Sequence, residues 1–376
     1  MPHEADIIII GAGVVGLAVA AQVAKEDRDV YVLEKNETFG LETSSRHSGV
    51  IHSGMYYPEG SLKAKLCVAG NQMLYQLCEE YSIGYKRLGK LVVATSDEET
   101  EELKRLIEKG QRNNTWGLRI LSGREVRELE PNVKGTAAIL SPSTGIFDSY
   151  ALMQYYISTA MNGRAQIAYK TKAVGIDKIA DGYKVTVEDE TGTSSFTTGV
   201  LINCAGLYCD NVAELAGIDV EEAGYKLHYC KGEYFSLSSS KGKLVKRLIY
   251  PVPSPHFISL GIHLAPDLEG RVRLGPSAEY VDSIDYAMDD RNQRLFLDAV
   301  KRYLPFIEYA DLAPEMAGIR PKLQEPGGEV RDFVIRDESD KGLPGLINLI
   351  GIESPGLTAS PAIAEYVGGL VDELLA

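Results

Sequence analysis

The chain has 376 residues, of which 44% are hydrophobic and 24% charged, a composition typical of a globular protein with a large apolar core. Its formal net charge of -14 argues against nucleic acid or anionic lipid as the main partner, because both are negatively charged. A small acidic substrate is not excluded, since a few buried cations can dominate a pocket. The five cysteines include no CxxC pair, which favours reduced thiols over disulfides or a zinc site.

The N-terminal segment does not have the pattern of a secretory signal peptide. The chain does not begin with a basic segment and a cleavage site, and it contains no run of roughly 18 apolar residues. We therefore expect a cytoplasmic protein that does not span a membrane. Peripheral contact with the inner face of the membrane is left open.

The beginning of the chain has the pattern of a βαβ unit with glycines at its first turn. An apolar strand, three glycines at GxGxxG spacing, a helix, a second apolar strand and an acidic residue follow one another. They are, in order, residues 6–10, the glycines Gly11, Gly13 and Gly16, residues 17–24, residues 30–33 and Glu34.

This order of elements predicts a dinucleotide site. Gly11 permits a tight turn, Gly13 lets the backbone approach a pyrophosphate, and Gly16 lets the helix pack close to the strand. The helix N-terminus offers free N–H groups and a partial positive charge to the phosphates. Glu34 can accept hydrogen bonds from a ribose diol, which disfavours NADP.

Strands at both ends of the chain point to FAD rather than NAD. We expect strands near residues 168–177, 183–187 and 200–203, and another at residues 345–350. A second glycine loop, residues 351–358, then opens a helix predicted over residues 361–374. The N-terminus of that helix can stabilise a reduced, anionic flavin.

Several segments resemble the D-amino-acid-oxidase-like superfamily of FAD enzymes, which includes glycerol-3-phosphate dehydrogenases, sarcosine oxidases and glycine oxidases. Within it, the chain is most similar to the L-2-hydroxyglutarate dehydrogenases and oxidases. The segments are residues 43–57, 60–67, 250–253, 260–263, 318–321 and 354–358. They extend from near the first strand to the last helix, so the resemblance covers the whole chain.

The resemblance implies an α/β protein in which a Rossmann-like FAD-binding fold is interleaved with an antiparallel-sheet (α+β) substrate domain. In the latter we expect strands at residues 88–94, 232–237, 248–250 and 272–274, and helices at residues 98–111 and 289–303. The expected FAD-binding domain comprises residues 1–80, 141–224 and 315–376. The expected substrate domain comprises residues 81–140 and 225–314.

His52, His263 and Arg320 are the candidate catalytic residues. Oxidation of an alcohol needs a base for the hydroxyl proton, and histidine suits that role. His52 lies in the segment that resembles the family's flavin-adjacent loop, although it could only hydrogen-bond the flavin or the backbone. His263 shares a strand face with Gly261, which leaves room for a ligand, although it could equally lie on the outer face.

Arg320 resembles the arginine that contacts the substrate anion in glycerol-3-phosphate dehydrogenases. A guanidinium binds a carboxylate through two parallel hydrogen bonds, and the alternative is a surface salt bridge. One of the cations Arg46, Lys63 and Lys65 is expected to hold a second carboxylate. The remaining candidates for substrate binding are hydrogen-bond donors, namely Tyr56, Tyr57 and Tyr250.

The predicted cofactor is noncovalent FAD, although some members of the superfamily attach the flavin through histidine or cysteine. We find no metal-ligand spacing and no nucleophile elbow. The residues expected at the FAD, besides Arg320, are Gly11, Gly13, Val14, Val15, Gly16, Glu34, Lys35, Thr43, Ser44, Ser45, His47, Ser48, Gly49, Val174, Cys204, Ala205, Gly206, Ser354, Pro355, Gly356, Leu357 and Thr358.

Three functions remain open from the sequence. The resemblance favours oxidation of L-2-hydroxyglutarate to 2-oxoglutarate. The same fold also supports oxidation of glycerol 3-phosphate or of sarcosine and other amino acids. A flavin-bound assembly protein without turnover is the third hypothesis. Oxygen, a quinone or a protein carrier could accept the electrons.

Overall fold

The first sheet joins the two ends of the chain. In the computed structural model, which describes residues 3–253 and 261–376, the central strand β1 (Ala5–Ile10) lies between β2 (Val30–Leu33) and β12 (Gly192–Asn203), parallel to both. β12 pairs in parallel with β20 (Leu343–Ile350) near the C-terminus. The sheet is completed by β9 (Gln166–Ala168), β10 (Lys172–Ile179), β11 (Gly182–Asp189) and β19 (Val334–Glu338).

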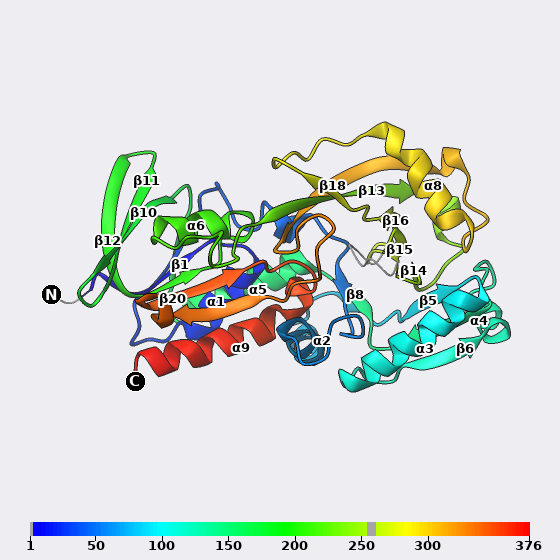
Figure 1. Cartoon of the computed structure of the whole chain (residues 1–376), viewed down its shortest axis with the longest axis horizontal. Coiled ribbons are helices and arrows are strands. Elements are labelled where there is room, and N and C mark those ends of the chain that lie inside the picture. Colours follow the sequence, from blue (N-terminus) through cyan, green and yellow to red (C-terminus); the bar gives the residue numbers. More distant parts are fainter. Residues whose placement is uncertain (1–2, 254–260) are drawn as a thin grey trace.

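β1 is apolar because both faces of the sheet are covered. Ile7 and Ile9 face a core that contains apolar residues of several helices, while Ile8 and Ile10 face a second core on the opposite side. The first core contains residues of α1 (Val14–Val23), α2 (Leu62–Glu80), α5 (Ser149–Asn162) and α9 (Gly356–Leu374), and the second contains residues of α6 (Cys209–Leu215). Figure 1 shows α9 running along the sheet beside α1.

The second sheet is mostly antiparallel. Its longest pairing joins β13 (His228–Leu237) to β18 (Leu312–Lys322), while β14 (Leu248–Pro251) pairs in parallel with β5 (Lys90–Ala94). Its other strands are β6 (Arg119–Ser122), β7 (Ala137–Ser141), β15 (His263–Pro266), β16 (Val272–Gly275) and β17 (Glu279–Val281). The helices α3 (Asp97–Arg112), α4 (Gly123–Leu129) and α8 (Gln293–Lys301) lie beside it in Figure 1, and the short α7 (Ser239–Gly242) follows β13 in the chain.

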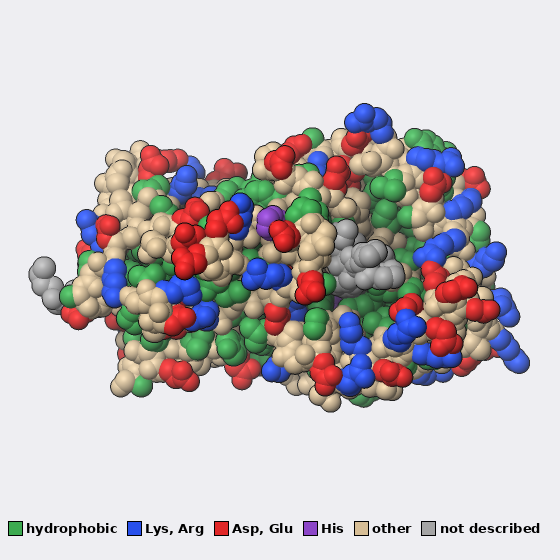
Figure 2. All heavy atoms as spheres, in the orientation of Figure 1, with side chains coloured by type: hydrophobic (Ala, Val, Ile, Leu, Met, Phe, Trp, Pro, Cys, Tyr) green, Lys and Arg blue, Asp and Glu red, His purple; other side chains and the backbone are tan. Residues whose placement is uncertain are grey.

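A small sheet of β3 (Val50–Ile51), β4 (Tyr85–Lys86) and β8 (Gly145–Phe147) lies between the two larger ones. On the face shown in Figure 2, acidic and basic side chains are intermixed over both halves of the molecule. None of the helices in the described part of the chain is long and apolar enough to cross a lipid bilayer. The predicted α/β class, with a nucleotide fold and a largely antiparallel second sheet, is confirmed.

Several predicted elements differ in extent from those observed; the strand expected over residues 200–203, for example, is β12, which begins at Gly192. The strand expected over residues 168–177 is two strands, because Lys170 between β9 and β10 has a φ of 53°. The helix expected over residues 289–303 is α8 alone, preceded by a 3-10 turn at Asp290–Asn292. The helix expected from residue 361 begins at Gly356 and contains Pro361, in its second turn.

Candidate active site

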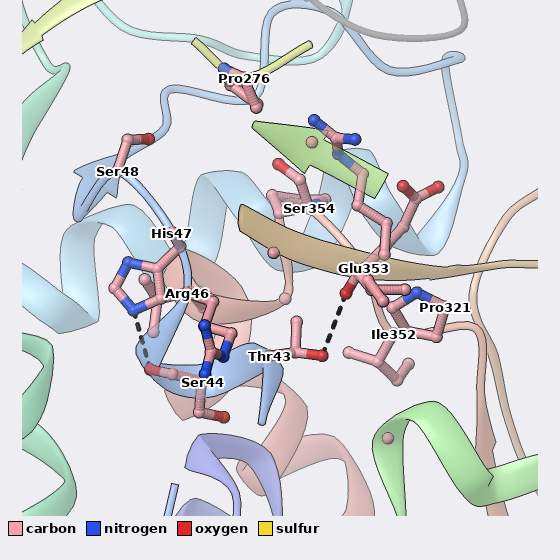
Figure 3. A pocket seen from close by; sticks show the side chains of 18 of the residues that line it. Thr43, Ser44, Arg46, His47, Ser48, Pro276, Pro321, Ile352, Glu353 and Ser354 are labelled. Atoms are coloured by element: carbon pink, nitrogen blue, oxygen red, sulfur yellow. Dashed lines mark hydrogen bonds between the residues drawn. The ribbon is translucent and has the colours of Figure 1, made fainter. Parts of the chain in front are cut away.

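A pocket lies where the end of β1, the loop after residue 42, β18 and the loop before α9 converge. Its wall brings together residues from both large sheets, and Figure 3 shows several of them. The predicted site residues in the wall are Gly13, Val14, Val15, Thr43, Ser44, Arg46, His47, Ser48, Gly49, His52, Tyr57, Lys63, Cys204, Gly206, His263, Arg320, Ser354, Pro355, Gly356 and Leu357. Those outside it are Gly11, Gly16, Glu34, Lys35, Ser45, Tyr56, Lys65, Val174, Ala205, Tyr250 and Thr358.

The glycine turn is packed so that two of its positions accept no side chain. A Cβ on Gly11 would lie 2.5 Å from the carbonyl oxygen of Cys204, and one on Gly16 would lie 2.0 Å from that of Gly11. Gly13 instead faces the pocket, where a Cβ would meet only the Ser44 hydroxyl, at 3.0 Å. The backbone is therefore free to approach a ligand at the N-terminus of α1.

The carboxylate of Glu34 fixes the glycine turn through hydrogen bonds. It accepts hydrogen bonds from the backbone N–H of Ala12 (2.9 Å) and from the backbone and side chain of Asn36 (2.9 and 2.8 Å). These bonds tie the end of β2 to the glycine turn. Binding of a ribose by Glu34 stays a prediction. The two carboxylate oxygens retain lone pairs that could accept hydrogen bonds from the ribose hydroxyls.

His47 stabilises the loop in which it lies. Its Nδ1 accepts from the N–H of Gly49 at 2.9 Å, so the proton is on Nε2, which donates to the carbonyl of Ser44 at 2.9 Å (Figure 3). Burial lowers the pKa of His47 to about 4, although the bond to Ser44 opposes the shift. The ring is therefore neutral and internally bonded, and it shapes the loop.

The backbone of His52 is fixed by two side chains. Thr358 at the start of α9 accepts from its N–H (3.0 Å), and Asn71 of α2 donates to its carbonyl (2.8 Å). Its Nε2 lies 3.5 Å from the Ser354 hydroxyl, while its buried Nδ1 has no hydrogen-bond partner within the described residues. Burial, Lys90 and His263 lower its pKa well below the usual value.

His263 has a defined tautomer. Its Nδ1 donates to the carbonyl of Gly261 at 2.9 Å, because a carbonyl only accepts, so Nε2 carries a lone pair. That Nε2 is buried without a hydrogen-bond partner in the described part of the chain. Burial lowers the pKa of His263 to about 3, with Lys90 and Arg320 contributing. The histidine is thus held as a neutral acceptor near two cations.

Arg320 is half buried in the pocket wall. Its guanidinium donates to the carbonyls of Ser277 (3.0 Å) and Cys230 (3.4 Å) and forms no ion pair with a described acid. Arg46 likewise has no acidic partner among the described residues; it lies over the ring of Tyr286, 3.9 Å from its centroid, and donates to the carbonyl of Ala317, while its buried Nε has no described hydrogen-bond partner. Arg320 therefore keeps its full positive charge for an anion.

A buried charge cluster occupies the end of the pocket. The Glu353 carboxylate oxygen accepts from Lys63 of α2 at 3.0 Å and from Lys322 of β18 at 3.1 Å, and all three side chains are at most 8% exposed. Burial alone would raise the pKa of Glu353, but the two lysines outweigh it and hold that pKa below its usual range. The cluster carries a net charge of about one positive unit, from two cations and one anion.

Three buried charged residues at or near the pocket were not predicted from the sequence, namely Lys90, Lys322 and Glu353. Lys322 could have been found from strand periodicity, since it lies two positions after Arg320 on the same face of β18. Lys90 is the sole charged residue of the predicted strand 88–94 and is completely buried. A charge inside an apolar strand is the signal that was available for it.

The sequence matches the family described as "DAO: FAD dependent oxidoreductase" over residues 6–370, and the chain therefore belongs to this family. The mitochondrial L-2-hydroxyglutarate dehydrogenase of Arabidopsis thaliana is 36% identical, with 97% of this chain and 83% of that protein aligned. A glycerol 3-phosphate dehydrogenase of Caloramator mitchellensis is 31% identical, with 96% and 72% aligned. The FAD-bound L-alpha-glycerophosphate oxidase of Mycoplasma pneumoniae superposes with a TM-score of 0.85 at 27% identity, covering 98% and 94% of the chains.

The predicted cofactor, FAD, is confirmed by the family, and the pocket fits it. The turn that would meet the pyrophosphate has glycine where a Cβ would intrude, and the N-terminus of α1 opens into the pocket. Residues of the loop 43–49 and of the N-terminus of α9 also line the pocket and would hold the flavin ring. No group of three or more histidine, cysteine or carboxylate side chains in the described residues is arranged to hold a metal ion.

Proposed function

We propose that this protein oxidises L-2-hydroxyglutarate to 2-oxoglutarate. The observation that carries the proposal is the pairing of an uncompensated Arg320 with a neutral His263 whose Nε2 lone pair is available. Such a pair binds a carboxylate and accepts a hydroxyl proton, the two requirements of a 2-hydroxyacid. The likeness to L-2-hydroxyglutarate dehydrogenases over nearly the whole chain supports the same substrate.

Arg320 would orient the substrate through its C1 carboxylate, because a guanidinium fork fixes both the position and the plane of that group. Nε2 of His263 then receives the proton of the C2 hydroxyl as the C2–H bond breaks and the C–O bond becomes a carbonyl. Bound FAD supplies the acceptor for the two electrons and the hydrogen that leave C2. The lowered pKa of His263 keeps this ring unprotonated at neutral pH.

Oxidation of glycerol 3-phosphate is the second candidate. The solved glycerophosphate oxidase and the Caloramator enzyme favour it, and Arg320 would serve a phosphate as well as a carboxylate. The two substrates differ in their number of anionic groups. Glycerol 3-phosphate has a single phosphate, whereas 2-hydroxyglutarate has two carboxylates.

Anaerobic stopped-flow mixing separates these functions. We expect L-2-hydroxyglutarate to bleach the flavin absorbance, and glycerol 3-phosphate and sarcosine to leave it unchanged. Rapid bleaching by glycerol 3-phosphate alone would replace the proposal with the second candidate, and no response to any substrate would favour an assembly role. Reoxidation by oxygen, a quinone or a protein carrier then identifies the electron acceptor.

Replacement of Arg320 tests its role in this reaction. Arg320→Ala should lower kcat/KM by several orders of magnitude, because the substrate loses the group that orients C2. Arg320→Lys keeps the charge but loses the planar fork, so it should also be impaired. Steady-state kinetics of both variants with the diacid, at matched flavin content, provide the measurement. Full activity in Arg320→Lys would show that charge alone is sufficient.

A further inference from the structure

We propose that Lys90 binds the second, distal carboxylate of the substrate, in a buried subsite that it forms with Tyr250 beside the two pocket histidines. This inference rests on the proposed function, because only a diacid needs such a subsite. It differs from the expectation that Arg46, Lys63 or Lys65 holds that carboxylate.

Lys90 is a buried cation without an anionic partner. It lies on β5 with β14 on one side and β7 on the other, and its side chain is fully buried. Its Nζ lies 4.3 Å from the ring centroid of Tyr56 and 4.6 Å from that of Tyr250 and has no hydrogen-bond partner within the described residues. Two aromatic faces compensate only part of the cost of burying an ammonium, so an anion is missing from its surroundings.

The groups around Lys90 are unsatisfied as well. The ring of His263 stacks on that of Tyr250, with 3.7 Å between centroids. The Tyr250 hydroxyl, His263 Nε2 and His52 Nδ1 are all buried without hydrogen-bond partners in the described part of the chain. Buried polar groups are nearly always paired, so this many unpaired atoms on adjoining residues indicate the position of a polar ligand. An ammonium and a phenol are both donors, which suits a carboxylate.

The other cations near the pocket are already engaged or lie elsewhere. Lys63 and Lys322 share the carboxylate of Glu353, and Arg46 lies over Tyr286. Lys65 is exposed on α2. Lys90 is therefore the buried cation whose charge a second substrate carboxylate would compensate.

The charge of Lys90 also responds to its surroundings. Burial lowers its pKa to about 7, and the groups facing it are Tyr56, Tyr250, His52, His263 and Cys67. In the substrate-free protein the ammonium therefore loses its proton as the pH rises above about 7. A bound carboxylate favours the charged form and raises that pKa.

The test compares two substrates that differ only in the distal group, L-2-hydroxyglutarate and L-2-hydroxypentanoate, in which a methyl group replaces the carboxylate. Lys90→Met should lower kcat/KM for the diacid about ten- to a hundredfold, the effect of one charge-assisted hydrogen bond, and change the value for the monoacid less than about threefold. Lys65→Met is the matched control and should change neither. Equal losses for both substrates, or no loss, would overturn the inference.

A second measurement needs no variant. In the wild-type protein, the ratio of kcat/KM for the diacid to that for the monoacid should fall as the pH rises above about 7, because kcat/KM reports the free enzyme and Lys90 then becomes neutral. A ratio that stays constant from pH 6 to 9 contradicts the assignment, even if Lys90→Met fails to fold.

A third measurement is independent of turnover. Glutarate, which lacks the hydroxyl, should perturb the flavin absorbance of the wild type and bind at least about tenfold more weakly to flavin-loaded Lys90→Met. Unchanged glutarate affinity in that variant would also overturn the inference. Reduction of the wild type by L-2-hydroxyglutarate decides the proposed function, so the two hypotheses fail on different results.

Discussion

Burial keeps the histidines His47 and His263 of this site neutral, and their hydrogen bonds fix the tautomer. His47 and His263 each bond a backbone carbonyl through one ring nitrogen, which fixes the tautomer, but only His263 leaves its second nitrogen without a described partner. The same residue type therefore shapes a loop at one position and offers a base at another. The difference depends on which backbone groups lie within reach of each ring.

The glycine turn gives the first prediction at this scale. Gly13→Leu should yield mostly flavin-free protein, because its side chain would enter the pocket beside Ser44, where the backbone must approach a pyrophosphate. Gly369→Leu on α9 is the matched control, since a Cβ there meets nothing within 4 Å. Flavin absorbance relative to protein absorbance measures the outcome. Equal flavin content in both variants would contradict the assignment of the turn.

At the residue scale, motifs predicted Gly13 of the turn, most of the loop 43–49, His263 and Arg320, and these residues line one pocket. They did not predict that Lys63 is paired, because its partner Glu353 is 290 positions away in the chain. Lys90 was missed for a related reason. Its two aromatic neighbours come from different segments, and only the folded chain brings them together.

Among the elements, the buried cluster of Lys63, Lys322 and Glu353 joins α2, β18 and the loop before α9. Each of these elements belongs to a different part of the chain, and the cluster fixes their positions at the pocket. Its stability depends on the carboxylate, since two buried ammonium groups without it would repel each other.

Loss of this carboxylate should be costly. Glu353→Ala should destabilise the protein by about 3–5 kcal/mol, whereas Glu365→Ala, at an exposed position on α9, should be close to neutral. Thermal unfolding of the flavin-free forms measures both. Because the folded-state pKa of Glu353 is lowered, its contribution is present at neutral pH and lost as the pH falls through that pKa. Similar unfolding temperatures for the two variants would show that the cluster does not stabilise the fold.

Periodicity predicted the elements well where buried positions recur regularly. They occur at every second residue in the middle of β11 and on one face of α3. It failed at boundaries that depend on backbone geometry, such as the turn at Lys170 between β9 and β10. It also placed the start of the last helix at Pro361, although α9 begins earlier, at Gly356. Pro361 is buried within the helix, and this burial is information that a local sequence pattern does not contain.

For the whole molecule, the pocket lies between two sheets and draws its wall from both. Bound flavin would therefore contact both sheets and act as a packing element as well as a cofactor. The division into a FAD-binding part (residues 1–80, 141–224 and 315–376) and a substrate part (residues 81–140 and 225–314) stays a prediction.

Removal of FAD should lower the unfolding temperature. A ligand that binds only the folded state stabilises it, by about 2.7 kcal/mol when its concentration is 100 times Kd. Differential scanning calorimetry of the holoprotein, of the flavin-free protein and of the protein reconstituted with FAD measures the shift in unfolding temperature. FMN, which lacks the adenosine part, is the control and should restore less. Identical melting of the holoprotein and the flavin-free protein would mean that the two sheets are held together without the flavin.

The pairing of β12 with β20 and the packing of α1 against α9 also bear on how the chain folds as it is synthesised. The glycine turn is made long before β20 and α9, which complete its surroundings. Until these two elements have been made, a nascent chain exposes the apolar residues of α1 that α9 covers, and such exposed surface favours aggregation. We therefore expect flavin to bind after α9 has packed against α1.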